Sequence, residues 1–133
     1  MLALMSKDVI ITMKRQGRNG YFPTYSLTIY DDGEVMYEGI KNVQTMGTHI
    51  SIISRPTLDQ MVYEFINIYY FALKDRYDNP KSDSCPIVIT SIKMDDKSKS
   101  IYHEHGSQAP KKISELEDKI DKIVNSKQWT GMS

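Results

Sequence analysis

The stretch PTYSLTIYDDGEVMYEG, residues 23–39, constrains the fold of this chain more than any other part of the sequence. Residues 24–30 alternate apolar with small polar side chains, which is the two-residue period of a half-buried strand. Asp32–Gly33 is a turn dipeptide, because glycine tolerates the positive φ that tight hairpin turns require. The alternation resumes over residues 34–39. The sequence therefore predicts a β-hairpin, and with it antiparallel pairing.

Other segments repeat one of two periods. β-branched runs predict strands, and the turn DDKS joins two of them into a second hairpin. Apolar residues at spacings of three and four predict helices that are apolar on one side. The predicted strands, besides the first hairpin, are residues 8–14, 42–54, 87–94 and 99–105, and the predicted helices are residues 54–73 and 110–129.

This order of elements favours the α+β class. Short hairpin loops imply antiparallel neighbours, and two one-sided helices need one sheet face to cover. We expect an antiparallel sheet of five or six strands with two helices packed on one face, in the order ββββαββα. Residues 8–129 are expected to form a single domain, with flexible ends at residues 1–7 and 130–133.

Three segments together resemble a known family. They are FPTYSLTIYDDGEVMYEG, FALKDRYD and ITSIKMDDKSKSIYHEHGSQAPKKISELEDKIDKI, in that order. They resemble an uncharacterised bacterial and archaeal domain, catalogued as domain of unknown function six-four-three-eight, over most of residues 8–129. Relatives of this kind carry cysteines where this chain has Arg18 and Phe22, so no thiol role is carried over. The resemblance implies one domain and no assigned activity.

Composition narrows the classes of function. Lysine plus arginine total 17 and aspartate plus glutamate total 17, so the chain lacks the basic excess of a dedicated nucleic-acid binder. Cys85 is the only cysteine, which excludes an intrachain disulfide and a four-cysteine zinc site. No apolar run approaches the ~20 residues that cross a bilayer. We expect a soluble cytoplasmic protein with no membrane partner.

His103 and His105 form the one metal-like motif. Residues two apart in a strand point to the same face, so the two imidazoles are predicted to project together and could share a divalent transition metal. A third ligand would have to come from Cys85, His49 or the Asp95–Asp96 pair, and nothing in the spacing selects one. The alternative is that the strand simply ends here. The cofactor, if any, therefore stays open.

Two further hypotheses concern binding. Arg15 and Arg18 lie beside Tyr21 in a glycine-bearing loop, a mixture that could hold a single-stranded nucleic acid, although the neutral charge argues against it. The leading interpretation is a small non-catalytic interaction module. It would bind a protein partner or a second copy through an edge strand or an exposed, tyrosine-rich sheet face bearing Tyr25 and Tyr37. A small enzyme using a metal at His103 and His105, or the Cys85 thiol, is the catalytic alternative.

Overall fold

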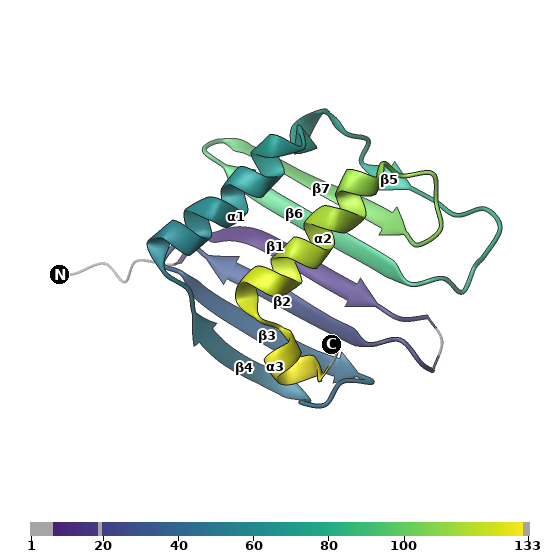
Figure 1. Cartoon of the computed structure of the whole chain (residues 1–133), viewed down its shortest axis with the longest axis horizontal. Helices are drawn as coiled ribbons and strands as arrows, with labels where there is room; N and C mark the ends of the chain where they lie inside the picture. The colour runs from purple at the N-terminus through teal and green to yellow at the C-terminus, as the bar shows by residue number, and fades with distance from the viewer. Residues whose placement is uncertain (1–6, 19, 132–133) are drawn as a thin grey trace.

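The computed structural model describes residues 7–18 and 20–131 as one seven-stranded sheet, with three α-helices on one of its faces (Figure 1). Across the sheet the strands run in the order β4-β3-β2-β1-β6-β7-β5. The strands are β1 (Val9–Gln16), β2 (Thr24–Tyr30), β3 (Glu34–Lys41), β4 (Gly47–Ile52), β5 (Arg76–Tyr77), β6 (Ile87–Met94) and β7 (Lys97–Glu104). The helices are α1 (Arg55–Asn67), the short 3-10 helix η1 (Tyr70–Ala72), α2 (Lys111–Val124) and α3 (Lys127–Thr130).

The predicted α+β class, both hairpins and the placement of the helices on one face are confirmed. The predicted counts of five or six strands and two helices are slightly too low. β5 has two residues, too few to show any periodicity, and it lies inside a segment predicted to be a loop. It pairs with β7 in parallel, whereas every other pair in the sheet is antiparallel.

The third helix arises because the predicted last helix is interrupted. Asn125 has φ 55 and ψ 50, in the left-handed region that asparagine tolerates better than most residues. Its N–H donates to the carbonyls of Asp121 and Lys122, which ends α2, and the chain starts a new short helix at Lys127. The break turns the chain so that Trp129 reaches the sheet.

The hydrophobic core lies between the helices and the sheet face that they cover, here named the covered face; the opposite one is the open face. Alternation along each strand sends every second side chain to the covered face. The largest side chains that become fully buried there are Ile11, Met13, Leu27, Ile29, Tyr37, Met61, Phe65, Tyr70, Ile92, Ile101, Ile113 and Leu116. One continuous cluster joins the sheet to α1, α2 and α3.

The expected exposure of Tyr25 and Tyr37 is wrong. Both lie on the covered face, where Tyr25 is 4% and Tyr37 0% exposed, because they share the alternation phase of Leu27. The Tyr37 ring stacks on Trp129 with 4.9 Å between ring centroids, and its hydroxyl donates to the Thr45 carbonyl. Tyrosine is used here as a core residue whose one polar atom finds a partner inside the protein.

The ends of the chain fall mostly outside the described residues, and so does most of the predicted flexibility at residues 1–7 and 130–133. Within the described part, Lys7 forms ion pairs with Asp32 and Glu34, and Thr130 is buried at the end of α3. Among the helices of residues 7–18 and 20–131, none is long and apolar enough to cross a membrane.

Two aromatic residues of α1 allow a test of this packing. Phe65 is fully buried and its ring meets Tyr70 edge-on at 4.8 Å, whereas Tyr63, on the same helix, is 55% exposed. We expect Phe65→Ala to lower the free energy of unfolding by about 3–5 kcal/mol, through lost burial and a cavity. Tyr63→Ala should change it by less than about 1 kcal/mol. Urea unfolding of both variants checks this, and equal losses would contradict the assigned faces.

Candidate functional site

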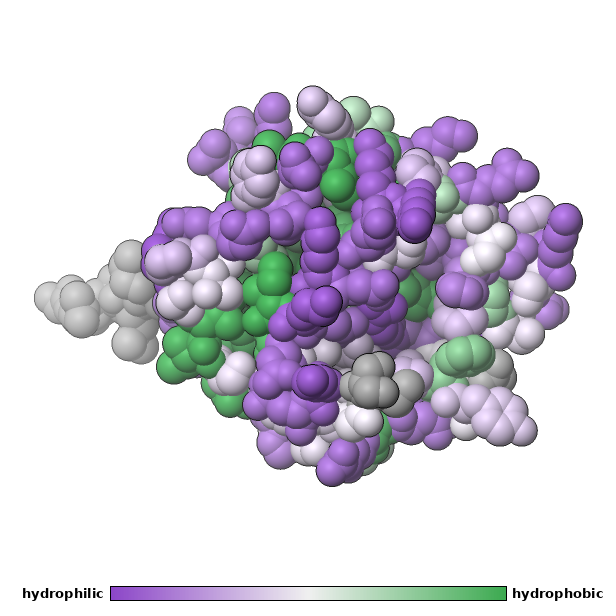
Figure 2. Space-filling view, viewed as in Figure 1, coloured by the Kyte–Doolittle hydropathy of each residue, from purple (hydrophilic) through white to green (hydrophobic). Residues whose placement is uncertain are grey.

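Strand β4 forms one free edge of the sheet, and nearly all of it is exposed. Its sequence, GTHISI, contains no charged residue and no proline. Ile50 pairs with Met36 of β3 on the open face, where Ile50 is 51% and Ile52 77% exposed. Ile40 of β3, on the same face, is 42% exposed. On the helix side, Figure 2 shows a hydrophobic area over the end of β4 and below α1, bordered by hydrophilic side chains.

The opposite edge of the sheet is built differently. β5 contributes two residues, and Arg76 lies with its guanidinium carbon 4.0 Å from the centre of the Tyr102 ring. Arg76 also pairs with Asp78, and Pro80 follows shortly after. Short length, charge and proline are the features by which natural sheets prevent strand addition at an edge. Only β4 is left without them.

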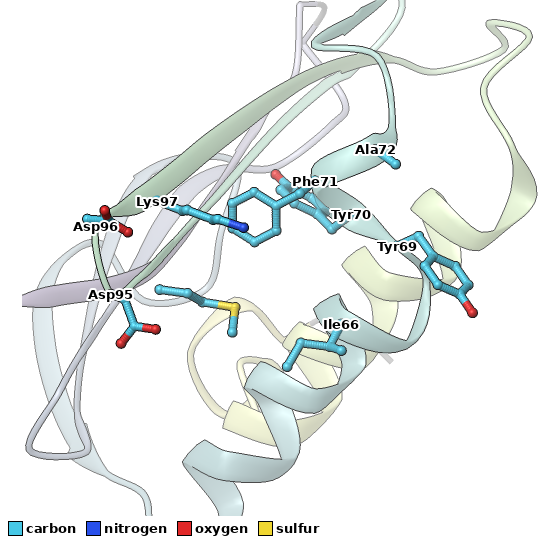
Figure 3. Close-up of a pocket in the computed structure, with 9 residues that line it drawn as sticks. Ile66, Tyr69, Tyr70, Phe71, Ala72, Asp95, Asp96 and Lys97 are labelled. Atoms are coloured by element: carbon cyan, nitrogen blue, oxygen red, sulfur yellow. The ribbon is translucent and has the colours of Figure 1, made fainter.

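A groove of about 410 Å³ opens between the end of α1, η1 and the tip of the β6–β7 hairpin (Figure 3). Its surface is mainly apolar, and the residues that line it are Ile66, Tyr69, Tyr70, Phe71, Ala72, Met94, Asp95, Asp96 and Lys97. Volumes of about 300–1,000 Å³ are typical of small-molecule sites. The groove is therefore large enough for a small ligand.

The shape of the groove depends on a sharp reversal at Tyr69. This residue has φ 57 and ψ 46, a left-handed conformation that is rare for a bulky side chain and costs about 1 kcal/mol or more. Its ring points away from Phe71 (Figure 3) and lies 5.8 Å from the ammonium of Lys112. After the reversal Tyr70 enters the core, where its hydroxyl bonds Thr90 and burial raises its pKa to about 12, while Phe71 faces the groove.

The structure does not bring His103 and His105 into one site. His103 is buried on the covered face, with Nδ1 2.7 Å from Oε2 of Glu117 on α2. His105 is exposed, one residue beyond the end of β7, and its backbone N–H donates to the Pro86 carbonyl. Within residues 7–18 and 20–131, no three His, Cys, Asp or Glu side chains are grouped to hold a metal ion.

Arg18, which follows the end of β1, contacts Cys85 and Glu104. Its Nε donates to the Cys85 carbonyl, and its Nη2 lies 3.2 Å from the Cys85 sulfur and 3.3 Å from Oε2 of Glu104. Glu104 also accepts from the Asn79 N–H and, at 2.8 Å, from the Tyr102 hydroxyl. These donors, the Asn79 N–H first, lower the pKa of Glu104 below its usual range. The Cys85 thiol is buried within this network.

Arg15 is likewise engaged. Its guanidinium forms ion pairs with Asp121 and Asp118 of α2, and Asp121 accepts from the hydroxyls of Tyr25 and Ser126. Burial, followed by the negative charge of Asp121, raises the pKa of Tyr25. The arginines of the predicted nucleic-acid loop thus serve ion pairs that tie the sheet to α2 and to the β7 end. Tyr21 remains 88% exposed.

The sequence predicts an edge strand as a binding surface, but it identifies neither β4 as that strand nor the groove. The sequence shows that β4 has no charged residue and no proline, but its position at the edge of the sheet comes from the structure. The groove had no sequence signal, because its walls come from residues 66–72 and 94–97, which no motif or period connects.

Comparison with known proteins identifies the family of the chain. A family model described as "Domain of unknown function (DUF6438)" matches residues 9–124, so the chain belongs to that family. The resemblance seen in the sequence is thereby confirmed. A search of curated proteins finds no match.

The hydrogen bonds to Glu104 predict that the free energy of unfolding depends on pH. Because the native pKa lies below the ordinary value of 4.5, the carboxylate stabilises the fold above that pH and loses this contribution as the pH falls through the lowered pKa. We expect Glu104→Gln to reduce the free energy of unfolding at neutral pH and to flatten its decline toward about pH 3. Urea unfolding across this range measures both effects. The exposed Glu115→Gln serves as control, and an unchanged slope for Glu104→Gln would refute the assignment.

Proposed function

We propose that this member of the DUF6438 family is a non-catalytic interaction module that binds by strand addition to β4, with a second copy of the chain as its partner. The observation that carries the proposal is the contrast between the two sheet edges. β5 is short and charged, whereas β4 is six residues long, uncharged and free of proline. An unprotected edge presents backbone donors and acceptors to another extended chain.

Self-pairing suits the residue pattern of β4. An antiparallel pair centred on Ile50 would place Ile50 opposite itself, Thr48 opposite Ile52 and His49 opposite Ser51. Cross-strand pairs of β-branched residues stabilise antiparallel sheets, by about 0.2–1 kcal/mol each. A charged residue on the two-fold axis would face its own copy, and Ile50, which would lie there, is uncharged. The neutrality of the strand supports a symmetric partner.

The open face adds apolar area to the same interface. Edge-to-edge pairing about a two-fold axis keeps the helices of both copies on one side, so the two seven-stranded sheets would continue into each other. Ile50 of one copy would then lie beside Ile50 of the other, and each Ile52 would lie diagonally beside the Ile50 of the other copy. Their exposed side chains would cover one another, which supplies the hydrophobic part of the interaction.

The proposal predicts the effect of charge at the centre of β4. We expect the wild-type chain to form dimers, and Ile50→Lys to raise the dimer dissociation constant by about tenfold or more, because two ammonium groups would face each other. Sedimentation equilibrium over a range of concentrations measures this. Ser100→Lys, also at an exposed open-face position but on β7 at the far side of the sheet from β4, should leave the dimer intact.

A charge-reversal mixture makes the experiment specific. Ile50→Glu alone should also be monomeric, whereas an equimolar mixture of Ile50→Lys and Ile50→Glu should form a heterodimer, since opposite charges would then meet. Mere loss of stability in either variant would not be rescued by mixing. A wild-type chain that stays monomeric at millimolar concentration, or a dimer that Ile50→Lys leaves unchanged, would contradict the proposal.

A further inference from the structure

We infer that the groove between α1, η1 and the β6–β7 hairpin is a binding site for a small apolar carboxylate, a flat ring or short chain that carries a single negative charge. This site is separate from the β4 edge. Its walls come from Ile66, Phe71 and Met94, and its volume of about 410 Å³ fits a ligand of one or two rings.

The apolar part of the site is held in place by the core beneath it. Tyr70 is 1% exposed. Its ring meets the rings of Phe65 and Phe71 edge-on, with 4.8 Å and 6.3 Å between ring centroids. Phe71 itself remains 36% and Ile66 48% exposed, on the side that faces the groove. A ring resting on fixed aromatic neighbours presents a preformed surface, so a ligand would not have to order it.

Lys97 is the one cation among the residues that line the groove, beside the two carboxylates of Asp95 and Asp96. This residue is the cross-strand partner of Met94, and such partners project to the same face, here the covered face from which the groove opens. In Figure 3 the Lys97 side chain points toward Phe71 on the other wall of the groove, while the carboxylates of Asp95 and Asp96 point in other directions. Among the described residues, the Lys97 ammonium makes no ion pair.

Two other lysines of the fold, Lys99 and Lys119, are paired with carboxylates. Lys99, two residues further along β7, donates to the Leu73 carbonyl and pairs with Asp75 at 2.6 Å, and Lys119 of α2 pairs with Glu64. Within the described part of the chain, Lys97 is thus a lysine on the wall of a mainly apolar groove that forms no ion pair with a carboxylate of the protein. A ligand carboxylate would form a charge-assisted hydrogen bond there, while its apolar body covered Phe71 and Ile66.

Three ligands that share one ring system and differ in charge distinguish a charge preference of the groove from nonspecific hydrophobic binding. Naphthoate, the neutral naphthamide and the cationic naphthylmethylammonium would be titrated into the protein and followed by shifts of the NMR signals of Phe71 and Met94. We expect naphthoate to bind about tenfold more tightly than naphthamide, and naphthylmethylammonium to bind most weakly. Equal or tighter binding of the cation would overturn the inference, because the two aspartates would then set the charge of the site.

A matched pair of lysine variants tests the role assigned to Lys97. Lys97→Met should weaken naphthoate about tenfold and leave naphthamide unchanged, because only the carboxylate loses its partner. Lys93→Met removes an exposed lysine of the same hairpin from the open face and should change neither affinity. Both positions are exposed, so folding is not at risk. No saturable naphthoate binding at millimolar concentration, or unaltered naphthoate affinity in Lys97→Met, would refute the site.

Discussion

The pairing of β1 with β6 is the interaction on which the rest of the structure depends. It joins residues 11–16 to residues 87–92, and so connects the N-terminal meander β1–β4 to the β6–β7 hairpin across more than half of the chain. The helices rely on it because α1 follows the first half and α2 the second, yet both cover the joined sheet (Figure 1). The ion pair of Arg15 on β1 with Asp121 on α2 also connects the centre of the sheet to a helix of the second half. Without the β1–β6 pairing, neither half of the sheet would offer the helices a complete face to cover.

Covering a single face decides where binding is possible. The large apolar side chains at the centre of the covered face are used by the core, including Tyr25 and Tyr37, and the centre of the open face carries small polar residues such as Ser26 and Thr28. Exposed apolar groups gather in two places used here, around Ile50 and Ile52 of β4 on one side of the sheet and around Phe71 beside the β6–β7 tip on the other. The two proposed sites therefore lie on different halves of the molecule and do not compete for the same residues.

The sequence was a good guide wherever structure is local. Asp32–Gly33 and Asp95–Asp96 each close a hairpin through neighbouring residues, and α1 and α2 follow from their apolar spacing. Tyr25 and Tyr37 were predicted to be exposed because a hydroxyl group favours contact with solvent. The Tyr37 hydroxyl instead donates to the Thr45 carbonyl inside the protein. Contacts such as Arg15 with Asp121, 106 residues apart, leave no trace in a single sequence. The groove, β5 and the edge position of β4 all depend on contacts of that long-range kind.

One consequence concerns the tail that follows the family match. The match ends at residue 124, whereas α3 comes after it and stacks Trp129 on Tyr37. The carbonyls of Trp129 and Thr130 also accept from the N–H groups of Thr45 and Gln44, in the segment that leads into β4. A chain truncated after residue 124 would lack these contacts, and the start of β4 would open more readily. The contacts of α3 would then affect how well β4 is presented to a partner.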